Sequence, residues 1–276
     1  MARVMAAAVK ADATLSLQRA REASEGVSGH AAAWPPLASS PSALTGFTAA
    51  LGVEVTALQF VDVLGLEEDL LGMLPGRCLA LVLLYPTTVA VQAHLDALEA
   101  RAPRTMSAAI FFRQLYGGTC GTLATLHAVV NGARALPAAD ALLGVTLRTE
   151  LLLDEAAAEG VAAAERLIER RSHAVLASAA IRLAHERAAI ASSAATARAG
   201  ERQGRHFLTF VAVDGRLILL DGRRHAPIDC GGTSEEGFLA HAVAEVRGLF
   251  AAAANDHDGT GSDHHAFSLM ALVGDR

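Results

Sequence analysis

The chain has 276 residues, of which 52% are hydrophobic, and this is enough for a full buried core in one large domain or two small ones. The formal net charge of −6 argues against nucleic acid as a partner, because phosphates attract a basic surface, and it suits a basic protein partner instead. Three cysteines in so long a chain are not typical of a disulfide framework, so a reducing compartment is expected. The longest charge-free run, 78–95, contains Pro86 and has only a strand-length apolar core, so no membrane-spanning helix is predicted.

The N-terminal segment, residues 1–32, is rich in alanine and serine with scattered arginines, and we expect a disordered tail there. The same composition also fits a mitochondrial transit peptide, although Asp12 and Glu22 argue against one. Residues 33–276 are then left as the folded part of the chain.

After the tail, hydrophobic periodicity and turn residues predict a mixture of helices and strands. Helices are expected at 42–51, 66–74, 88–101 and 120–137, in several pieces between 137 and 204, and at 234–251. Strands are expected within 58–66, 77–86 and 107–114, as a hairpin over 206–222, and within 264–273. Ser40 and Ser234 stand where N-cap residues are needed for two of the helices.

One cysteine stands out in the segment QLYGGTCGTLATLH, residues 114–127, where a glycine-rich loop leads to an apolar helical pattern. Cys120 is placed at or near the N-terminus of that helix, whose partial positive charge and free N–H groups favour a thiolate. Cys120 is therefore a candidate nucleophile. A small buried hydrophobic residue is the alternative, because cysteine often has only that role.

The predicted hairpin brings a histidine and a carboxylate together. If Asp214 and Gly215 form a two-residue turn, Val213 pairs with Arg216, and Asp221 lies opposite the residue two positions after His206. Side chains alternate between the faces of a strand, so His206 and Asp221 are diagonal neighbours on one face, about 7–8 Å apart at the backbone. A carboxylate that orients a histidine is what the base of a nucleophile requires, although a strand-end histidine beside a turn aspartate is also consistent with this register.

Taken together, these motifs resemble the ubiquitin carboxyl-terminal hydrolase family of cysteine peptidases. The resemblance runs from about Trp34 to Val273, and its blocks occur in the family's order. They are WPPLASSPSALTGFTAALGV, FVDVLGLEEDLLGMLPGRCLALVLLYP, QLYGGTCGTLATLHAVVN, HFLTFVAVDGRLILLDGRRHAPIDCG and FSLMALV.

The resemblance implies a role for four residues. Cys120 is the nucleophile, and His206 is the base toward the thiol and then the acid toward the leaving group. Asp221 holds the imidazole tautomer. Gln114, six positions before the cysteine, donates its side-chain amide to the oxyanion beside the backbone N–H of Cys120.

The family also implies a fold and a function. The fold is an α/β (α+β), papain-like one, with a central, mainly antiparallel sheet wrapped by helices and a knotted chain path. The expected activity is hydrolysis of amide, ester or thioester adducts after the C-terminal glycine of ubiquitin or a ubiquitin-like protein. No cofactor or metal is expected, the partner is ubiquitin, the protein is a monomer, and the location is the cytoplasm or the nucleus.

Two departures from the family's pattern are visible. Gly118 stands where the family usually has asparagine, so a hydrogen bond that braces the loop is expected to be missing. Cys120 and His206 are also further apart than in compact members. The segment ASSAATARAGERQG, residues 191–204, is predicted as the crossover loop that spans the cleft in this family, with an ordinary linker as the alternative.

Other polar and thiol groups are given simpler interpretations. Residues 255–265, NDHDGTGSDHH, match part of the residue pattern of a calcium-binding loop. They carry histidine where that loop needs glutamate, so we expect a solvated turn. His127 is expected to be a buried, hydrogen-bonded residue, Cys78 an inert thiol in a buried strand, and Cys230 an exposed thiol in a turn.

Two other functions compete with the hydrolase. A catalytically weak ubiquitin-binding scaffold is compatible with Gly118 and the longer insert, although such a protein need not retain all four site residues. An unrelated cysteine acyltransferase is disfavoured by the order of the flanking blocks.

Overall fold

The computed structural model describes residues 34–103, 107–137, 139–153, 160–193, 204–254 and 267–274. Residues 35–276 cluster into one unit, and the description below concerns that unit. The tail predicted for residues 1–32 lies outside the described residues. So does the predicted turn at 255–265, as well as positions 194–203 of the predicted crossover loop.

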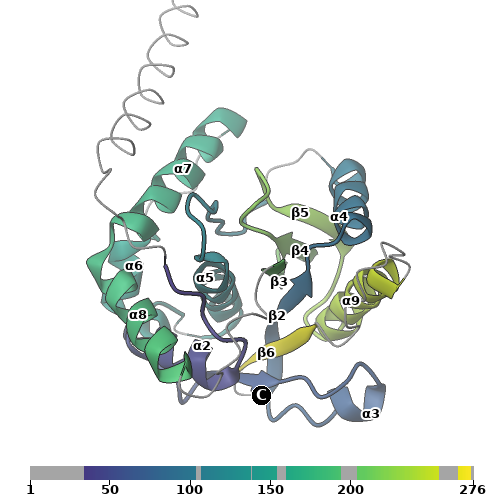
Figure 1. Ribbon diagram of the computed structural model, residues 1–276, viewed down its shortest axis with the longest axis horizontal. Helices are drawn as coiled ribbons and strands as arrows, with labels where there is room; N and C mark the ends of the chain where they lie inside the picture. Colours follow the sequence, from purple (N-terminus) through teal and green to yellow (C-terminus); the bar gives the residue numbers. More distant parts are fainter. Residues whose placement is uncertain are drawn as a thin grey trace, which may run out of the picture. The chain divides into compact units, whose positions relative to one another are not determined.

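A six-stranded sheet forms the centre of the described unit (Figure 1). Its order is β1-β6-β2-β3-β4-β5, and each neighbouring pair is antiparallel, as predicted. The strands are β1 (Leu58–Asp62), β2 (Arg77–Pro86), β3 (Arg205–Val213), β4 (Arg216–Leu220), β5 (Ile228–Gly232) and β6 (Ser268–Gly274).

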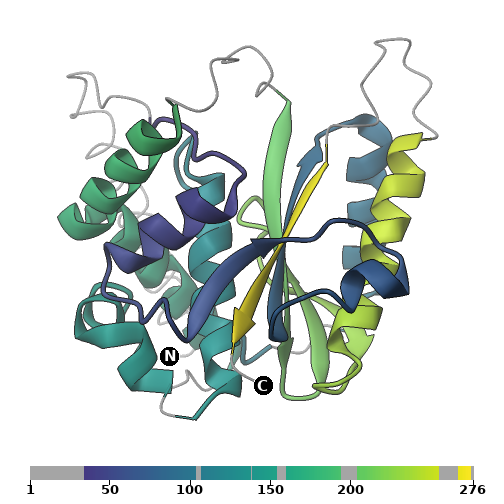
Figure 2. The same cartoon turned by 90° about the horizontal axis from the view of Figure 1, so that it is seen from below.

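Helices cover both faces of this sheet (Figure 2). They are α2 (Pro41–Ala49), α3 (Glu68–Leu71), α4 (Val89–Arg101), α5 (Cys120–Gly132), α6 (Ala139–Glu150), α7 (Val161–Ala177), α8 (Ala179–Ser193) and α9 (Phe238–Ala254), with a 3₁₀ turn η1 (Ala133–Ala135) after α5. The helix α5 packs on one face together with α2, α6, α7 and α8, whereas α4 and α9 cover the other face. Because α8 continues to Ser193, the first three positions of the predicted crossover loop are helical, and this part of the prediction is wrong.

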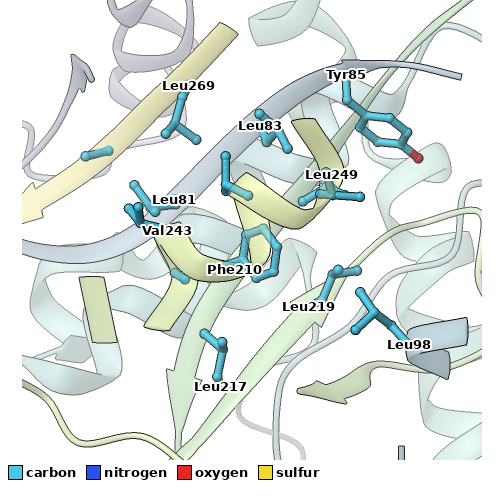
Figure 3. Close-up of a cluster of buried hydrophobic side chains, with 14 of the residues drawn as sticks. Leu81, Leu83, Tyr85, Leu98, Phe210, Leu217, Leu219, Val243, Leu249 and Leu269 are labelled. Carbon is cyan, nitrogen blue, oxygen red and sulfur yellow. The ribbon is translucent and has the colours of Figure 1, made fainter. Parts of the chain in front are cut away.

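Central strands of this sheet are buried on both sides, and their sequences show it. Residues 79–83 of β2 are all buried and all apolar, so this strand appears as a continuous apolar run. Residues 206–211 of β3 are buried as well, with His206 and Thr209 as the polar residues among them. Between the sheet and the pair α4 and α9 lies a large apolar cluster (Figure 3), to which Leu81, Leu83, Phe210, Leu219 and Leu249 contribute fully buried side chains. Each such side chain contributes about 1.5–3 kcal/mol relative to an exposed one.

One predicted strand is absent. The segment 107–114 forms no regular strand, although its sequence SAAIFFRQ fits one. Its backbone groups are instead bonded by side chains and by a loop carbonyl from other parts of the fold, as described below, so no ladder partner is needed.

Two details near the C-terminal half also differ from the expectations. Cys230 lies in the strand β5 and is half-buried, so its assignment to an exposed turn is wrong; pairing with β4 decides the conformation of this short, glycine-containing stretch. Ser234 accepts a hydrogen bond from the N–H of Gly237 (3.0 Å) and thus caps the turn ahead of α9, which begins only at Phe238. Ser40, by contrast, is the N-cap of α2 as predicted.

Candidate active site

The hairpin that carries His206 and Asp221 has the predicted register. Val213 pairs with Arg216, and Thr209 pairs with Leu220. Asp214 and Gly215 both have positive φ values, 50° and 72°, which is the conformation of the two-residue turn that best matches the twist of a hairpin. The ladder ends one pair before Asp221, which directly follows β4 and stays on the face of the sheet that carries His206.

His206 and Asp221 form a buried hydrogen-bonded pair. The distance from His206 Nε2 to Asp221 Oδ1 is 2.6 Å, and both side chains are 1% exposed. Asp221 also accepts hydrogen bonds from the Arg223 N–H at Oδ1 (2.9 Å) and from the Tyr85 hydroxyl at Oδ2 (3.2 Å). Burial alone would raise the pKa of Asp221, but the hydrogen bond and charge of His206 outweigh it and lower the pKa below its ordinary value. The carboxylate is therefore ionised and fixed.

Cys120 approaches this pair from the first residue of α5. That helix packs on β3 through the Thr209 hydroxyl, which donates to the carbonyl of Ala124 (2.8 Å). Thr119 is the N-cap residue but makes no side-chain cap, because its hydroxyl donates to the Tyr116 carbonyl (2.8 Å). N–H groups of the first turn of α5 are thus left for an anion beside Cys120.

The thiol and the imidazole shift each other's proton affinity. Burial raises the pKa of the Cys120 thiol, yet the His206 imidazole and the Phe207 N–H outweigh it and hold the pKa below its ordinary value. Burial lowers the pKa of His206, but its hydrogen bonding to Asp221 and Cys120 raises it overall. Both directions favour a thiolate beside an imidazolium, the reactive form of such a pair.

The second imidazole nitrogen, His206 Nδ1, makes no hydrogen bond of ordinary geometry within the described part of the chain. Because Nε2 is bound to Asp221, Nδ1 is the nitrogen that remains for the Cys120 sulfur. Pairs of this kind are often loose in a resting enzyme and tighten when substrate binds.

Gln114 lies in the loop that leads to α5. Its side-chain Nε2 donates one hydrogen bond to the carbonyl of Tyr116 (3.0 Å), and its backbone N–H donates to the carbonyl of Gly222 (2.7 Å). Gly222 directly follows Asp221, and a Cβ at this position would lie 3.2 Å from Gln114 Cβ, so a side chain there would press on the loop that carries Gln114. The loop that carries Asp221 thus also holds Gln114.

Three buried polar side chains hold the segment that precedes Gln114. Asn131 Oδ1 accepts from the Ile110 N–H (2.8 Å), and its amide donates back to the Ile110 carbonyl (2.9 Å). His127 Nε2 accepts from the Phe112 N–H (2.9 Å), and the hydroxyl of Ser172 on α7 accepts from the Arg113 N–H (2.8 Å). We call residues 110–114 the tethered segment.

His127 is therefore the buried, hydrogen-bonded residue that the sequence predicted. Its ring is stacked on Phe111 and Phe112, and burial lowers its pKa to about 3, which keeps it neutral and able to accept. Asn131 and Ser172 were missed by the sequence reasoning. The available signal was weak: Asn131 stands four residues after His127, on the same face of a mostly apolar helix.

The loop conformation explains one departure from the family's pattern. Gly118 has a φ of +82°, a left-handed backbone that glycine and asparagine adopt more readily than other residues. Glycine therefore preserves the path of the loop toward Cys120, although it supplies no side-chain amide.

The other two cysteines differ from Cys120. Burial raises the pKa of both Cys78 and Cys230 to about 12, and neither is paired in a disulfide. Cys120 is the cysteine among the three with a lowered pKa. Of the three, it is the one placed to act as a nucleophile.

The residues within the described ranges contain no cluster of three or more His, Cys, Asp or Glu side chains arranged to hold a metal ion. Among the helices that the structure describes, none combines the length and the apolar character that a membrane crossing requires.

Comparison with known proteins assigns this arrangement to a family. The family model "Ubiquitin carboxyl-terminal hydrolase, family 1" matches residues 34–250. A probable ubiquitin carboxyl-terminal hydrolase of Dictyostelium discoideum is 30% identical over 210 residues, covering 75% of this chain and 77% of that protein. Human ubiquitin carboxyl-terminal hydrolase isozyme L1 is 32% identical over 214 residues, covering 77% of this chain and 89% of that protein.

A solved structure shows the same fold. The catalytic domain of Trichinella spiralis UCH37, crystallised bound to ubiquitin vinyl methyl ester, superposes with a TM-score of 0.61 at 19% sequence identity. The match covers 88% of this chain and 96% of that domain. The papain-like arrangement expected from the sequence is thereby confirmed.

Proposed function

The chain belongs to the ubiquitin carboxyl-terminal hydrolase family, and we propose that it cleaves adducts after the C-terminal glycine of ubiquitin or a ubiquitin-like protein. The observation that carries this proposal is the placement of Cys120 at the N-terminus of α5 beside the buried His206–Asp221 pair. Amide, ester and thioester adducts all present the same carbonyl, and a thiolate attacks each of them.

The first half of the reaction forms an acyl-enzyme. The Cys120 thiolate attacks the glycine carbonyl, and the electron pair of the C=O bond moves to oxygen. The resulting oxyanion is placed near the uncapped N–H groups at the start of α5. When the tetrahedral intermediate collapses, the His206 imidazolium gives its proton to the departing amine, and the carbonyl is left as a thioester of Cys120.

The second half is hydrolysis. Neutral His206 takes a proton from water, the hydroxide attacks the thioester, and the intermediate expels the Cys120 thiolate, with the carboxyl group released on ubiquitin. Asp221 keeps the Nε2–H bond in place throughout, so that Nδ1 exchanges protons with thiol, leaving group and water.

Gln114 is proposed as the side-chain oxyanion donor. A primary amide has two N–H bonds, and the Tyr116 carbonyl occupies one of them, which leaves the second for substrate. The tethered segment supports this role, because it fixes the backbone from which the amide projects.

A probe with a C-terminal electrophile tests the function directly. Ubiquitin vinyl methyl ester should add to Cys120 and form one stable thioether, which intact and peptide mass spectrometry would locate. The variant Cys120→Ala should bind ubiquitin with unchanged affinity but form no adduct and hydrolyse no substrate. Efficient turnover by Cys120→Ala would contradict the mechanism.

The same experiment decides the alternative of a catalytically weak scaffold. A scaffold would bind the probe without covalent capture, even at high concentration and long incubation. Comparison of ubiquitin probes with probes of ubiquitin-like proteins would show which modifier the chain prefers.

We also propose that residues 33–276 make up the catalytic domain. The family match begins at residue 34, which supports this boundary. A chain that lacks residues 1–32 should retain the kcat/KM of the full chain on a small ubiquitin adduct, and a large loss of activity would move the boundary toward the N-terminus.

Localisation in the cytoplasm or nucleus is a further proposal. It is supported by the free state of Cys78, Cys120 and Cys230, which a reducing compartment maintains. Microscopy of a chain tagged at its C-terminus tests it, and accumulation inside an organelle would argue for the transit-peptide alternative.

A further inference from the structure

Tyr85 contacts the candidate catalytic pair from the neighbouring strand. It stands directly opposite His206 in the β2–β3 register, and the two rings meet edge to face with centroids 5.7 Å apart. Its hydroxyl donates a hydrogen bond to Asp221 Oδ2 (3.2 Å), and its side chain is fully buried. Neither the periodicity of β2 nor the motifs around Cys120 and His206 indicated such a contact.

The Asp221 carboxylate is therefore held at both oxygens. His206 Nε2 and the Arg223 N–H bind Oδ1, whereas Tyr85 binds Oδ2 from another strand. Rotation about the Cβ–Cγ bond moves both oxygens of a carboxylate, so a donor on the second oxygen adds a restraint to those already on the first. Tyr85 thus supplies the second point of attachment.

The hydroxyl is not needed to fill the core. Tyr85 continues the row of Leu81 and Leu83 in the apolar cluster beneath α4 and α9, and Figure 3 shows its oxygen pointing away from those leucines. A phenylalanine ring would occupy the same space and would bury no hydroxyl group. A buried hydroxyl that lacks a hydrogen-bond partner costs about 1–3 kcal/mol.

We propose that Tyr85 is a positioning residue of the hydrolase, which fixes Asp221 through Oδ2 and moderates the strength with which this carboxylate stabilises the His206 imidazolium. The proposal rests on the proposed function for its catalytic consequence, but not for the hydrogen bond itself. A donor on Oδ2 draws negative charge away from the oxygen that binds His206. Without it, the imidazolium is stabilised further, and it becomes a weaker acid toward a leaving amine.

Other groups near Asp221 must be accounted for in any pH experiment. His206 and Tyr85 face it from the sheet, Arg224 acts on it from its own loop, and His127 on α5 experiences its charge. Arg224 is itself held by Asp96 and Glu99 of α4. Apart from Tyr85 itself, none of these side chains is altered by a change from tyrosine to phenylalanine at position 85.

The decisive measurement requires no substrate. The rate at which iodoacetamide alkylates Cys120 is followed against pH, with peptide mass spectrometry to exclude Cys78 and Cys230. The alkaline limb of this profile reports loss of the imidazolium proton. In Tyr85→Phe, this limb should move to higher pH by about 0.5, because the removed donor leaves Asp221 more basic.

Catalysis supplies the second measurement. For a ubiquitin–amide substrate, Tyr85→Phe should lower kcat/KM by about three- to tenfold, the scale expected from a weaker acid and a less firmly held carboxylate. Thr48→Val is the matched control: it removes another buried hydroxyl, which donates to the Leu44 carbonyl (3.2 Å) in α2, and it should change neither profile nor rate. Thermal unfolding of both variants establishes that they are folded.

The outcomes are distinct. The proposal would be overturned if the alkaline limb of Tyr85→Phe stayed at the pH of the wild type or moved to lower pH. The hydroxyl would then not withdraw charge from Asp221. If the wild-type chain hydrolyses no ubiquitin adduct while the limb still moves to higher pH, the positioning role stands and the proposed function fails.

Discussion

The two halves of the candidate site are built in different ways. On one side, His206 and Asp221 come from a hairpin whose strands are joined by a two-residue turn, and both side chains are almost completely buried. On the other side, Cys120 and Gln114 come from a helix N-terminus and from a loop that is held by side chains of α5 and α7. Pairing within one hairpin produces the first half, and contacts between a loop and two helices produce the second.

Exposure separates the halves in the same way. The base and its carboxylate lie within the sheet, where a low dielectric strengthens their mutual interaction. The loop before Cys120 exposes Leu115 and Tyr116 at 38% and 43%, and Cys120 itself is half-buried. The acid–base half is thus shielded from solvent, whereas the nucleophile half is partly exposed to it.

A substitution in the His206–Asp221 pair of the hairpin should have the largest effect on the rate. Asp221→Asn should lower kcat by about 10²–10⁴-fold, because an amide can select the wrong imidazole tautomer and does not stabilise imidazolium. Circular dichroism should show a folded protein, and ubiquitin binding should persist. A variant with a near-normal kcat would show that His206 acts without its carboxylate.

Among substitutions in the half that carries Cys120 and Gln114, loss of the Gln114 amide should have the next largest effect on the rate. Gln114→Ala should raise the activation free energy by about 2–4 kcal/mol, since one oxyanion donor is lost. Steady-state kinetics on a small ubiquitin adduct should place the change in kcat. A change confined to KM would mean that Gln114 only binds substrate.

The tethered segment offers a sharper test of the comparison. His127→Leu leaves the buried Phe112 N–H without its acceptor, which should lower the free energy of unfolding by about 1–3 kcal/mol. It should also lower kcat by about tenfold, because displacement of Gln114 costs part of the contribution of an oxyanion donor.

A conservative variant at the same position is the control. In His127→Gln, an amide oxygen can occupy the place of Nε2, so part of both losses should be recovered. If His127→Leu is destabilised while kcat is unchanged, the segment serves the fold and does not position Gln114.

The smallest effect is expected at the two cysteines outside the site. Cys78→Ser and Cys230→Ser should each keep kcat/KM within about twofold of the wild type, as is usual for changes that touch no special feature. At neutral pH, iodoacetamide should label Cys120 first, because the pKa of each of the other thiols is raised to about 12. Preferential labelling of Cys78 or Cys230 would contradict the assignment of the nucleophile.

The pH dependence of the activity follows from the same pair. The pKa of Cys120 is lowered and that of His206 is raised, so the thiolate–imidazolium form should be populated in the window between them. Activity should fall in acid as the thiolate is protonated and in alkali as the imidazolium loses its proton.

The sequence by itself determined those parts of the protein in which neighbours along the chain interact. The alternation of β3 and β4 about Asp214 and Gly215 sets the register and places His206 and Asp221 on one face, because a hairpin's pairing depends only on its turn and its period of two. The apolar run of β2 likewise predicted a strand covered on both faces.

Only the tertiary structure decided the parts whose partners are distant. The apolar segment 107–114 has the composition of a strand, yet Asn131, His127 and Ser172 take its hydrogen bonds and no ladder forms. Tyr85 stands 136 positions from Asp221, and β5 becomes a strand because β4 pairs with it. Such contacts depend on how elements pack together, and a pattern of residues along one element carries no information about which side chain of another element will meet it.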